Sequence, residues 1–300
     1  MERKKVTIVT HNSGFHTDDI FAVATLCLVL EKDNEVTVIR SRQRDIIESG
    51  DYVVDTGEVY DAENNRFDHH QSGGAGLRDN GIPYASFGLV WKKFGQQLSG
   101  SSEVATRIDQ SIVQPIDAGD NGIKFMETKI ADLHPVDVGL ITSLFTPTWN
   151  EDLTKIDDVF LELVSYAKSF LTRAIKSISD SEKGKRLVLE IYKNSSDKRY
   201  ITLPNSRYPW EEVLSELPEP LFVLYQNINN ETWSIKSIRN DMFSYEPRKK
   251  LPESWGGKRD EELEKITGVS GAVFCHNARF MAVAKTKEAI LKMAEIALNS

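Results

Sequence analysis

Residues 6–30 read VTIVTHNSGFHTDDIFAVATLCLVL and decide the fold of the first part of the chain. β-Branched residues over Val6–Thr10 predict a strand, and the apolar run over Asp19–Leu30 predicts a helix. This order is typical of a mostly parallel sheet covered by helices, in which ligands bind just beyond the carboxyl ends of the strands. His11 directly follows the strand, so the segment predicts both a fold and the place of a binding site.

The same alternation continues through the first 120 residues. Further strands are predicted at Val36–Arg40 and Tyr52–Val54, and helices at Tyr84–Phe94 and Val104–Ile116. Asp55 directly follows the third strand and adds a carboxylate at the same edge. We therefore expect an α/β domain with a mostly parallel sheet and flanking helices.

The chain has 300 residues, enough for two domains that each bury a core. A capping-box pattern that starts at Thr154 opens a helix to about Ile178, and a polar stretch that contains Gly184 follows it. We therefore expect one domain over residues 1–182 and a smaller α+β domain over residues 183–300. In the second domain we expect strands at Leu187–Tyr192, Leu221–Tyr225, Thr232–Arg239 and Ala272–Cys275 and a helix at Lys287–Leu298.

Composition excludes several classes of protein. The net charge of −8, from 37 basic and 45 acidic residues, argues against a broad electrostatic grip on duplex nucleic acid. The apolar run Ile20–Leu30 is too short to cross a bilayer, and the first residues leave no room for a targeting extension. Cys27 and Cys275 form neither a disulfide framework nor a thiolate zinc site. We expect a cytoplasmic protein that does not bind membranes, and no pattern indicates an oligomer.

Histidines and acidic residues cluster at the predicted sheet edge. Four of the six histidines fall within the first 70 residues, among several aspartates. The candidate ligands are His11, His16, Asp18, Asp19, Asp55, Asp68, His69, His70, Asp117 and Asp120. A lone histidine is more often structural than a ligand. Buried imidazoles and carboxylates are costly unless paired or metallated, so the clustering favours a metal site.

The ligand types narrow the metal and the reaction. Imidazole and carboxylate without thiolate suit Mn²⁺, Zn²⁺, Fe²⁺ or Co²⁺ better than Mg²⁺. There are more candidate ligands than one ion needs, so we expect two ions about 3.5–4 Å apart, bridged by a carboxylate such as Asp55 and by hydroxide. Two Mn²⁺ ions are expected, with Mg²⁺, Co²⁺ or Zn²⁺ as alternatives. Such a pair favours hydrolysis of a phosphoester or phosphoanhydride.

Six motifs, one of them divided between two segments, together resemble the signatures of the melanocyte proliferating gene family, a branch of the Asp-His-His phosphoesterase superfamily. Four lie in the first domain: HNSGFHTDD at 11–19, DTGEVYD at 55–61, RFDHHQ at 66–71 and IDAGDNG at 116–122. In the second domain, LPESW at 251–255, followed by RDEEL at 259–263, and VFCH at 273–276 match its other signatures. The resemblance therefore extends over the whole chain.

The resemblance implies a two-domain hydrolase with metal ions in the parallel-sheet domain and a substrate grip in the smaller domain. The family's eukaryotic members are described as 3′ to 5′ RNA exonucleases. By motif, the implied metal ligands are His11, His16, Asp18, Asp55, Asp68, His69 and Asp117, with Asp120 as the alternative to Asp117. The implied catalytic residues are Asp55, His69 and His70.

Substrate contacts are less defined than the metal ligands. The candidates are His70, His276, Arg259 and Arg279. The family usually has a glycine-bearing segment after the second-domain histidine, whereas this chain has Asn277-Ala278-Arg279 there, so Arg279 is either a phosphate contact or a surface residue. Three tryptophans either stack on bases or belong to the core, and His134 is expected in a loop; the tryptophans are Trp210, Trp233 and Trp255.

Three functions follow from these residues. The first is a 3′–5′ exonuclease on RNA or short single-stranded nucleic acid, with hydroxide activated by two metal ions. The second is a small-molecule phosphatase, pyrophosphatase or nucleotidase, which a closed pocket for a small anion would favour. The third is a non-catalytic metal-binding protein, which the loss of a motif ligand would favour, and Asp18, Asp55, His69 and Asp117 are all present.

Overall fold

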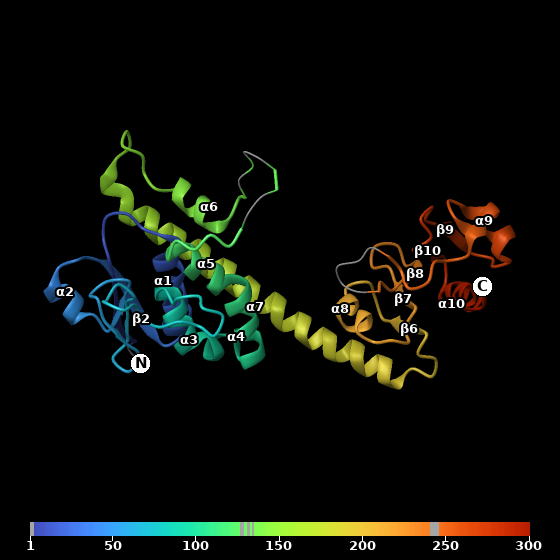
Figure 1. Cartoon of the computed structure of the whole chain (residues 1–300), viewed down its shortest axis with the longest axis horizontal. Helices are drawn as coiled ribbons and strands as arrows, with labels where there is room; N and C mark the ends of the chain where they lie inside the picture. The colour runs from blue at the N-terminus through green and yellow to red at the C-terminus, as the bar shows by residue number, and fades with distance from the viewer. Residues whose placement is uncertain (1–2, 127–128, 131–132, 134, 241–245) are drawn as a thin grey trace. The chain divides into compact units, whose positions relative to one another are not determined.

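The chain divides into two compact units, Met1–Ser179 and Asp180–Ser300. The computed structural model describes residues 3–126, 129–130, 133, 135–240 and 246–300 (Figure 1). His134, expected in a loop, lies outside the described residues. Helix α7 (Ile156–Asn194) runs through the division between the units, so the domain boundary placed at 182/183 stays a prediction.

The first unit holds a five-stranded sheet of order β2-β1-β3-β5-β4. Its strands are β1 (Lys4–Thr10), β2 (Asn34–Arg40), β3 (Tyr52–Val54), β4 (Tyr60–Asp61) and β5 (Arg66–Phe67). Strands β2, β1, β3 and β5 are parallel, and β4 is antiparallel to β5. The predicted α/β fold with a mostly parallel sheet is therefore confirmed.

Strand register brings three chain segments to one edge of this sheet. Val9 pairs with Val53, and Val54 pairs with Phe67. Strand β1 ends one residue before His11, β3 ends at Val54, and β5 ends at Phe67. The residues that follow these strands therefore leave the sheet at its carboxyl edge, where the first three motifs begin or continue.

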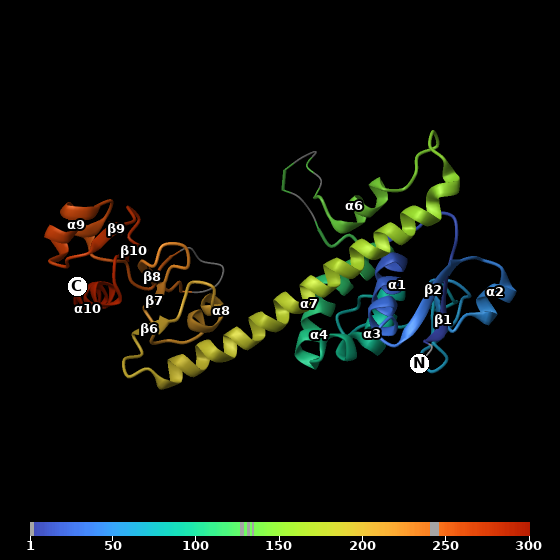
Figure 2. The ribbon, with the colours of Figure 1, turned by 180° about the vertical axis from the view of Figure 1, so that it is seen from behind.

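Helices cover the sheet and form the core of the first unit. They are α1 (Thr17–Leu30), α2 (Arg44–Ser49), α3 (Ser86–Ser99), α4 (Ser102–Ile108), α5 (Gln114–Asp120), α6 (Val138–Leu144) and the first part of α7. Residues 20–26 of α1 are fully buried, because this helix is apolar on every side. Figures 1 and 2 show α1 beside the sheet and beside the first part of α7, which shares its core.

The helix predicted over Val104–Ile116 is confirmed, but it is not α-helical throughout. Its middle, Asp109–Val113, forms a π-helical turn between α4 and α5. Such turns insert an extra residue into the helical ladder and often lie at functional sites. The next helix, α5, begins with a proline in its first turn and carries the fourth motif.

Two predictions about α7 are wrong. The strand expected at Leu187–Tyr192 is part of this helix, because Val188, Ile191 and Tyr192 follow helical spacing and pack together into a core of the second unit. The capping box expected at Thr154 is absent. Asp152 instead accepts a hydrogen bond from the Thr154 amide at 3.0 Å and begins a short 3₁₀ turn. Within the described part of the chain, no helix is long and apolar enough to cross a membrane.

The second unit is built on a mixed sheet of order β6-β7-β8-β10-β9. Its strands are β6 (Tyr200–Leu203), β7 (Phe222–Gln226), β8 (Trp233–Ser237), β9 (Ala272–Cys275) and β10 (Met281–Ala284), and its further helices are α8 (Trp210–Ser215), α9 (Asp260–Thr267) and α10 (Lys287–Asn299). Trp210 and Trp255 are buried in two separate core clusters, and Trp233 is half-buried against the cluster of Trp255. This placement favours the structural role for these tryptophans.

Candidate metal centre

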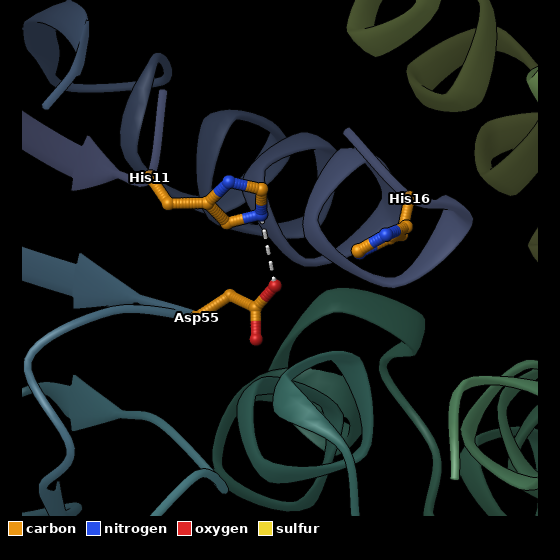
Figure 3. Close-up of side chains that lie close together, drawn as sticks. All are labelled: His11, His16 and Asp55. Carbon is orange, nitrogen blue, oxygen red and sulfur yellow. Dashed lines mark ion pairs between the residues drawn. The ribbon is translucent and has the colours of Figure 1, made fainter. Parts of the chain in front are cut away.

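His11 and Asp55 follow neighbouring parallel strands and point toward each other (Figure 3). His11 Nε2 lies 3.3 Å from an Asp55 oxygen and 3.1 Å from an oxygen of Asp19. Burial alone would lower the pKa of His11, but these two carboxylates raise it to about 10. A surplus of buried negative charge therefore surrounds this imidazole, as it would surround a bound cation.

Asp55 lies at the centre of the cluster. Its Oδ2 atom faces His11, and its Oδ1 atom lies 3.3 Å from His69 Nε2 and 3.5 Å from His70 Nδ1. The hydroxyl of Ser86 donates to Oδ1 at 3.0 Å. Burial would raise the pKa of Asp55, but its two imidazole partners hold that pKa far below the usual range. Oδ2 thus faces His11, and Oδ1 faces His69 and His70.

His69 connects Asp55 to two carboxylates that come from helices. Its Nε2 atom lies 3.2 Å from Asp120 at the end of α5, and Asp18 at the start of α1 is also close. Nε2 is buried, yet it makes no hydrogen bond of good geometry with these oxygens. A buried nitrogen that faces several acceptors in this way fits a metal ligand better than a hydrogen-bond donor.

The structure brings these side chains into three overlapping groups of potential ligands. The groups are His11, His16 and Asp55; Asp55, His69 and His70; and Asp18, His69 and Asp120, each with ligand atoms within 4.8 Å of one another. Asp55 and His69 each belong to two groups. The mixed imidazole and carboxylate sets fit divalent transition metals.

The first turn of helix α3 stabilises two of the buried acids. The amides of Ser86 and Phe87 donate to Asp18 at 3.0 and 2.8 Å, and the amide of Gly88 donates to Asp117 at 3.0 Å. Amides at a helix N-terminus bind negative charge favourably. A Cβ atom on Gly88 would lie 1.9 Å from an Asp117 oxygen, so this close approach requires glycine.

Asp117 forms a buried ion pair with Arg78. Arg78 Nη1 lies 2.7 Å from its carboxylate, and the same guanidinium contacts Asp109 at 3.0 Å and lies over the ring of Tyr84 at 4.1 Å. Burial raises the pKa of Asp117 to about 7 against the opposing effect of Arg78. Of the two acids in the fourth motif, Asp120 joins the ligand groups found among the described residues and Asp117 does not.

Asp68 also lies outside the three ligand groups of the described chain. Its Oδ1 atom contacts His70 Nδ1 at 2.7 Å, and its Oδ2 atom accepts a hydrogen bond from the Glu58 amide at 2.6 Å. The His70 side chain keeps 57% of its surface exposed. Asp68 therefore orients the exposed His70 ring through its Nδ1 atom.

Arg40 holds the loop that carries His16. It lies at the end of β2, is 2% exposed at its side chain, and donates to the carbonyls of Ser13 and Gly14 at 2.9 Å each. Its guanidinium also pairs with Asp157 at 2.5 Å. Nothing in the sequence indicates this contact, because the strand pattern predicts Arg40 only as the last residue of a strand.

Three substrate candidates lie around the β9–β10 hairpin of the second unit. His276 Nδ1 accepts a hydrogen bond from the Ala278 amide at 3.0 Å, and its ring lies 4.5 Å from that of Phe280. Arg279 occupies the turn with a φ of 60°. Arg259 lies over the ring of Phe274 at 4.4 Å. Arg259 and His276 thus both lie beside the ring of Phe274, whose centroid is 6.3 Å from that of His276.

Comparison with known proteins covers nearly the whole chain. The model labelled MYG1 exonuclease and described as an uncharacterised protein family (UPF0160) matches residues 7–298. The chain is 31% identical to the "MYG1 protein" of Dictyostelium discoideum, over 98% of this chain and 97% of the relative. It is 31% identical to a MYG1 protein of Saccharomyces cerevisiae, over 97% and 95%. It is 28% identical to the "MYG1 exonuclease" of Mus musculus, over 97% of this chain and 84% of the relative.

Proposed function

Because this chain belongs to the MYG1 exonuclease family (UPF0160), as its motifs predict, we propose that it is a metal-dependent hydrolase of phosphoester bonds. The observation that carries the proposal is the position of Asp55, whose two oxygens face His11 and His69 in separate ligand groups. A carboxylate placed in this way is suited to bridge two cations.

Two divalent ions are proposed, with Mn²⁺ preferred by the mixed ligands. One ion would be held by His11, His16 and Asp55. The ligands of the other ion would include Asp55 and His69. The second set is completed by Asp18 and Asp120, which we place ahead of Asp117 because Arg78 already neutralises Asp117. When bound, such a pair supplies an activated hydroxide and stabilises charge during displacement at phosphorus.

His70 is proposed to contact the substrate. Asp68 binds its Nδ1 atom at 2.7 Å, so Nε2 is the ring nitrogen left for another partner. The ring is more than half exposed, and it lies beside Asp55. With Nδ1–H donated to Asp68, Nε2 of the neutral ring is an acceptor, and the protonated ring can donate from Nε2 to a phosphate oxygen or to the leaving oxygen.

RNA or short single-stranded nucleic acid is the proposed substrate, degraded from its 3′ end. Mammalian relatives are named exonucleases, and their similarity to this chain includes both units. In the second unit, His276 and Arg279 are proposed to contact the substrate backbone.

The test is a screen of labelled RNA, single-stranded DNA, dinucleotides, nucleoside monophosphates and pyrophosphate with Mn²⁺. We expect hydrolysis of the RNA and the dinucleotides. Asp55→Asn should lower the rate by more than about 100-fold, because it removes a charge that both ions would share. Asp45→Asn, the same change on the exposed surface of α2, should leave the rate unchanged.

Two outcomes would contradict the proposal. The first is an Asp55→Asn variant that keeps wild-type activity. The second is the absence of Mn²⁺-dependent turnover on every substrate in the screen.

A further inference from the structure

A cavity of about 540 Å³ lies beside the candidate metal centre, within the first unit. His16, Asp18 and Asp120 form one part of its lining, and all three belong to the ligand groups. Most of the remaining lining is apolar and includes Phe15, Phe21, Ile112, Ile116, Phe125 and Phe170. Its size is that of pockets that hold small organic ligands, for which about 300–1,000 Å³ is typical.

The charges around the cavity restrict what can occupy it. Neither lysine nor arginine lines it in the described part of the chain, and its charged side chains are Asp18, Asp120 and Asp137. A phosphate group placed among the apolar residues would find no positive partner and would lose its hydration. The phosphate of a ligand must therefore stay at the metal side, and the part that enters the cavity must be uncharged.

The aromatic residues indicate a flat, unsaturated group. Phe125 and Phe170 line the cavity and remain 49% and 40% exposed, so their rings offer surface to a ligand. Phe170 also packs edge-on against Phe21, with ring centroids 5.8 Å apart, which fixes its position. Any of the nucleobases can stack on such rings, because every base has a π-face.

We propose that this cavity binds a nucleobase of the substrate while the adjoining phosphate lies at the metal centre. The inference rests on the proposed hydrolase function and extends it, since it separates nucleotide substrates from inorganic pyrophosphate and polyphosphate. Those anions carry no uncharged group that could fill the apolar part. The cavity thus acts as the specificity-determining subsite of the first unit.

Binding of adenosine 5′-monophosphate and of ribose 5-phosphate to the Mn²⁺-loaded protein tests the proposal by calorimetry. The two ligands share the sugar phosphate and differ in the base. We expect the nucleotide to bind about tenfold or more tightly, because base stacking contributes on that scale. Equal affinities for the two ligands would overturn the proposal.

Two variants locate the preference in the cavity. Gly119→Leu fills it from the α5 side, where a Cβ atom would meet no other atom within 4 Å. Phe170→Ala removes one aromatic wall. In both variants the ratio of the affinity for adenosine 5′-monophosphate to the affinity for ribose 5-phosphate should fall close to one. The affinity for ribose 5-phosphate itself should not change. Tyr166→Ala is the matched control, because Tyr166 lies one turn earlier on α7, is 53% exposed and does not line the cavity.

The outcomes separate this inference from the proposed function. A preference that survives Gly119→Leu in a protein with normal thermal unfolding would overturn the cavity proposal and leave the hydrolase proposal intact. A preference that is lost in Gly119→Leu and kept in Tyr166→Ala supports the cavity. It does so even if the hydrolysis screen fails, in which case the catalytic proposal alone falls.

Discussion

At the scale of single residues, Asp117 and Asp120 have different partners although they are three residues apart on α5. Asp117 is fully buried against Arg78, whereas Asp120 faces His69. Sequence reasoning left both as candidates for the fourth-motif ligand. Residues at positions i and i+3 share a helix face, so spacing alone could not choose between them. The partner that distinguishes them, Arg78, lies in a loop far away in the sequence.

Substitution of each acid should give a different defect. At pH 8, above the pKa of about 7 for Asp117, Asp117→Asn leaves Arg78 with an incomplete buried partner and should lower the free energy of unfolding by about 3 kcal/mol. Asp120→Asn should leave that free energy nearly unchanged and weaken Mn²⁺ binding by about 10-fold or more. Denaturant unfolding and calorimetric metal titration measure the two effects. The reverse pattern would return Asp117 to the ligand set.

At the scale of elements, the strand–loop–helix segment from β1 to α1 depends on a contact from β2. Arg40 binds two carbonyls of the loop and pairs with Asp157 on α7. A lysine keeps the charge but cannot reproduce the planar, multiple hydrogen bonds of a guanidinium. The loop that places His16 should therefore become less ordered in Arg40→Lys.

Mn²⁺ titration of Arg40→Lys checks this role. We expect its affinity for the ion that we propose His11 and His16 hold to fall by about tenfold. Arg44→Lys is the control, since the Arg44 side chain is 91% exposed and pairs with Glu48 one turn further along its own helix. Indistinguishable titrations of the two variants would rule out a positioning role for Arg40.

Elements with strong periodicity were predicted well, and those set by distant contacts were not. Strand β9 has the predicted bounds Ala272–Cys275, and α10 begins at the predicted Lys287. Strands β4 and β5 contain two residues each, too few for any periodic signal. The prediction of a strand at Leu187–Tyr192 was wrong because an apolar run with β-branched residues can also continue a helix. Packing into one core cluster with Leu203 and Trp210 stabilises the helix.

At the scale of the whole molecule, the three ligand groups found in the described chain all belong to the first unit. The second unit has its own sheet and core. A ligand that binds only the folded state stabilises the part that holds it. Metal binding should therefore protect the first unit directly, and the second unit only as far as the two are coupled.

Hydrogen exchange with and without Mn²⁺ measures this difference. We expect slower exchange at residues 8–19, 53–70 and 86–120 after metal is added, and little change in β6–β10. Chelation should reverse the effect. Equal protection in both units would contradict the assignment of the metal centre to the first unit alone.

The backbone of Asp55 carries a further consequence. Its φ of 54° lies in the left-handed region, which costs a non-glycine residue about 1–2 kcal/mol. Glycine at this position would relieve that strain, but it would also remove the carboxylate that pairs with His11 and His69. Backbone strain thus favours glycine at this position, whereas the buried imidazoles and the proposed metal ions favour aspartate. The centre of the proposed site is therefore a position where backbone strain and side-chain chemistry oppose each other.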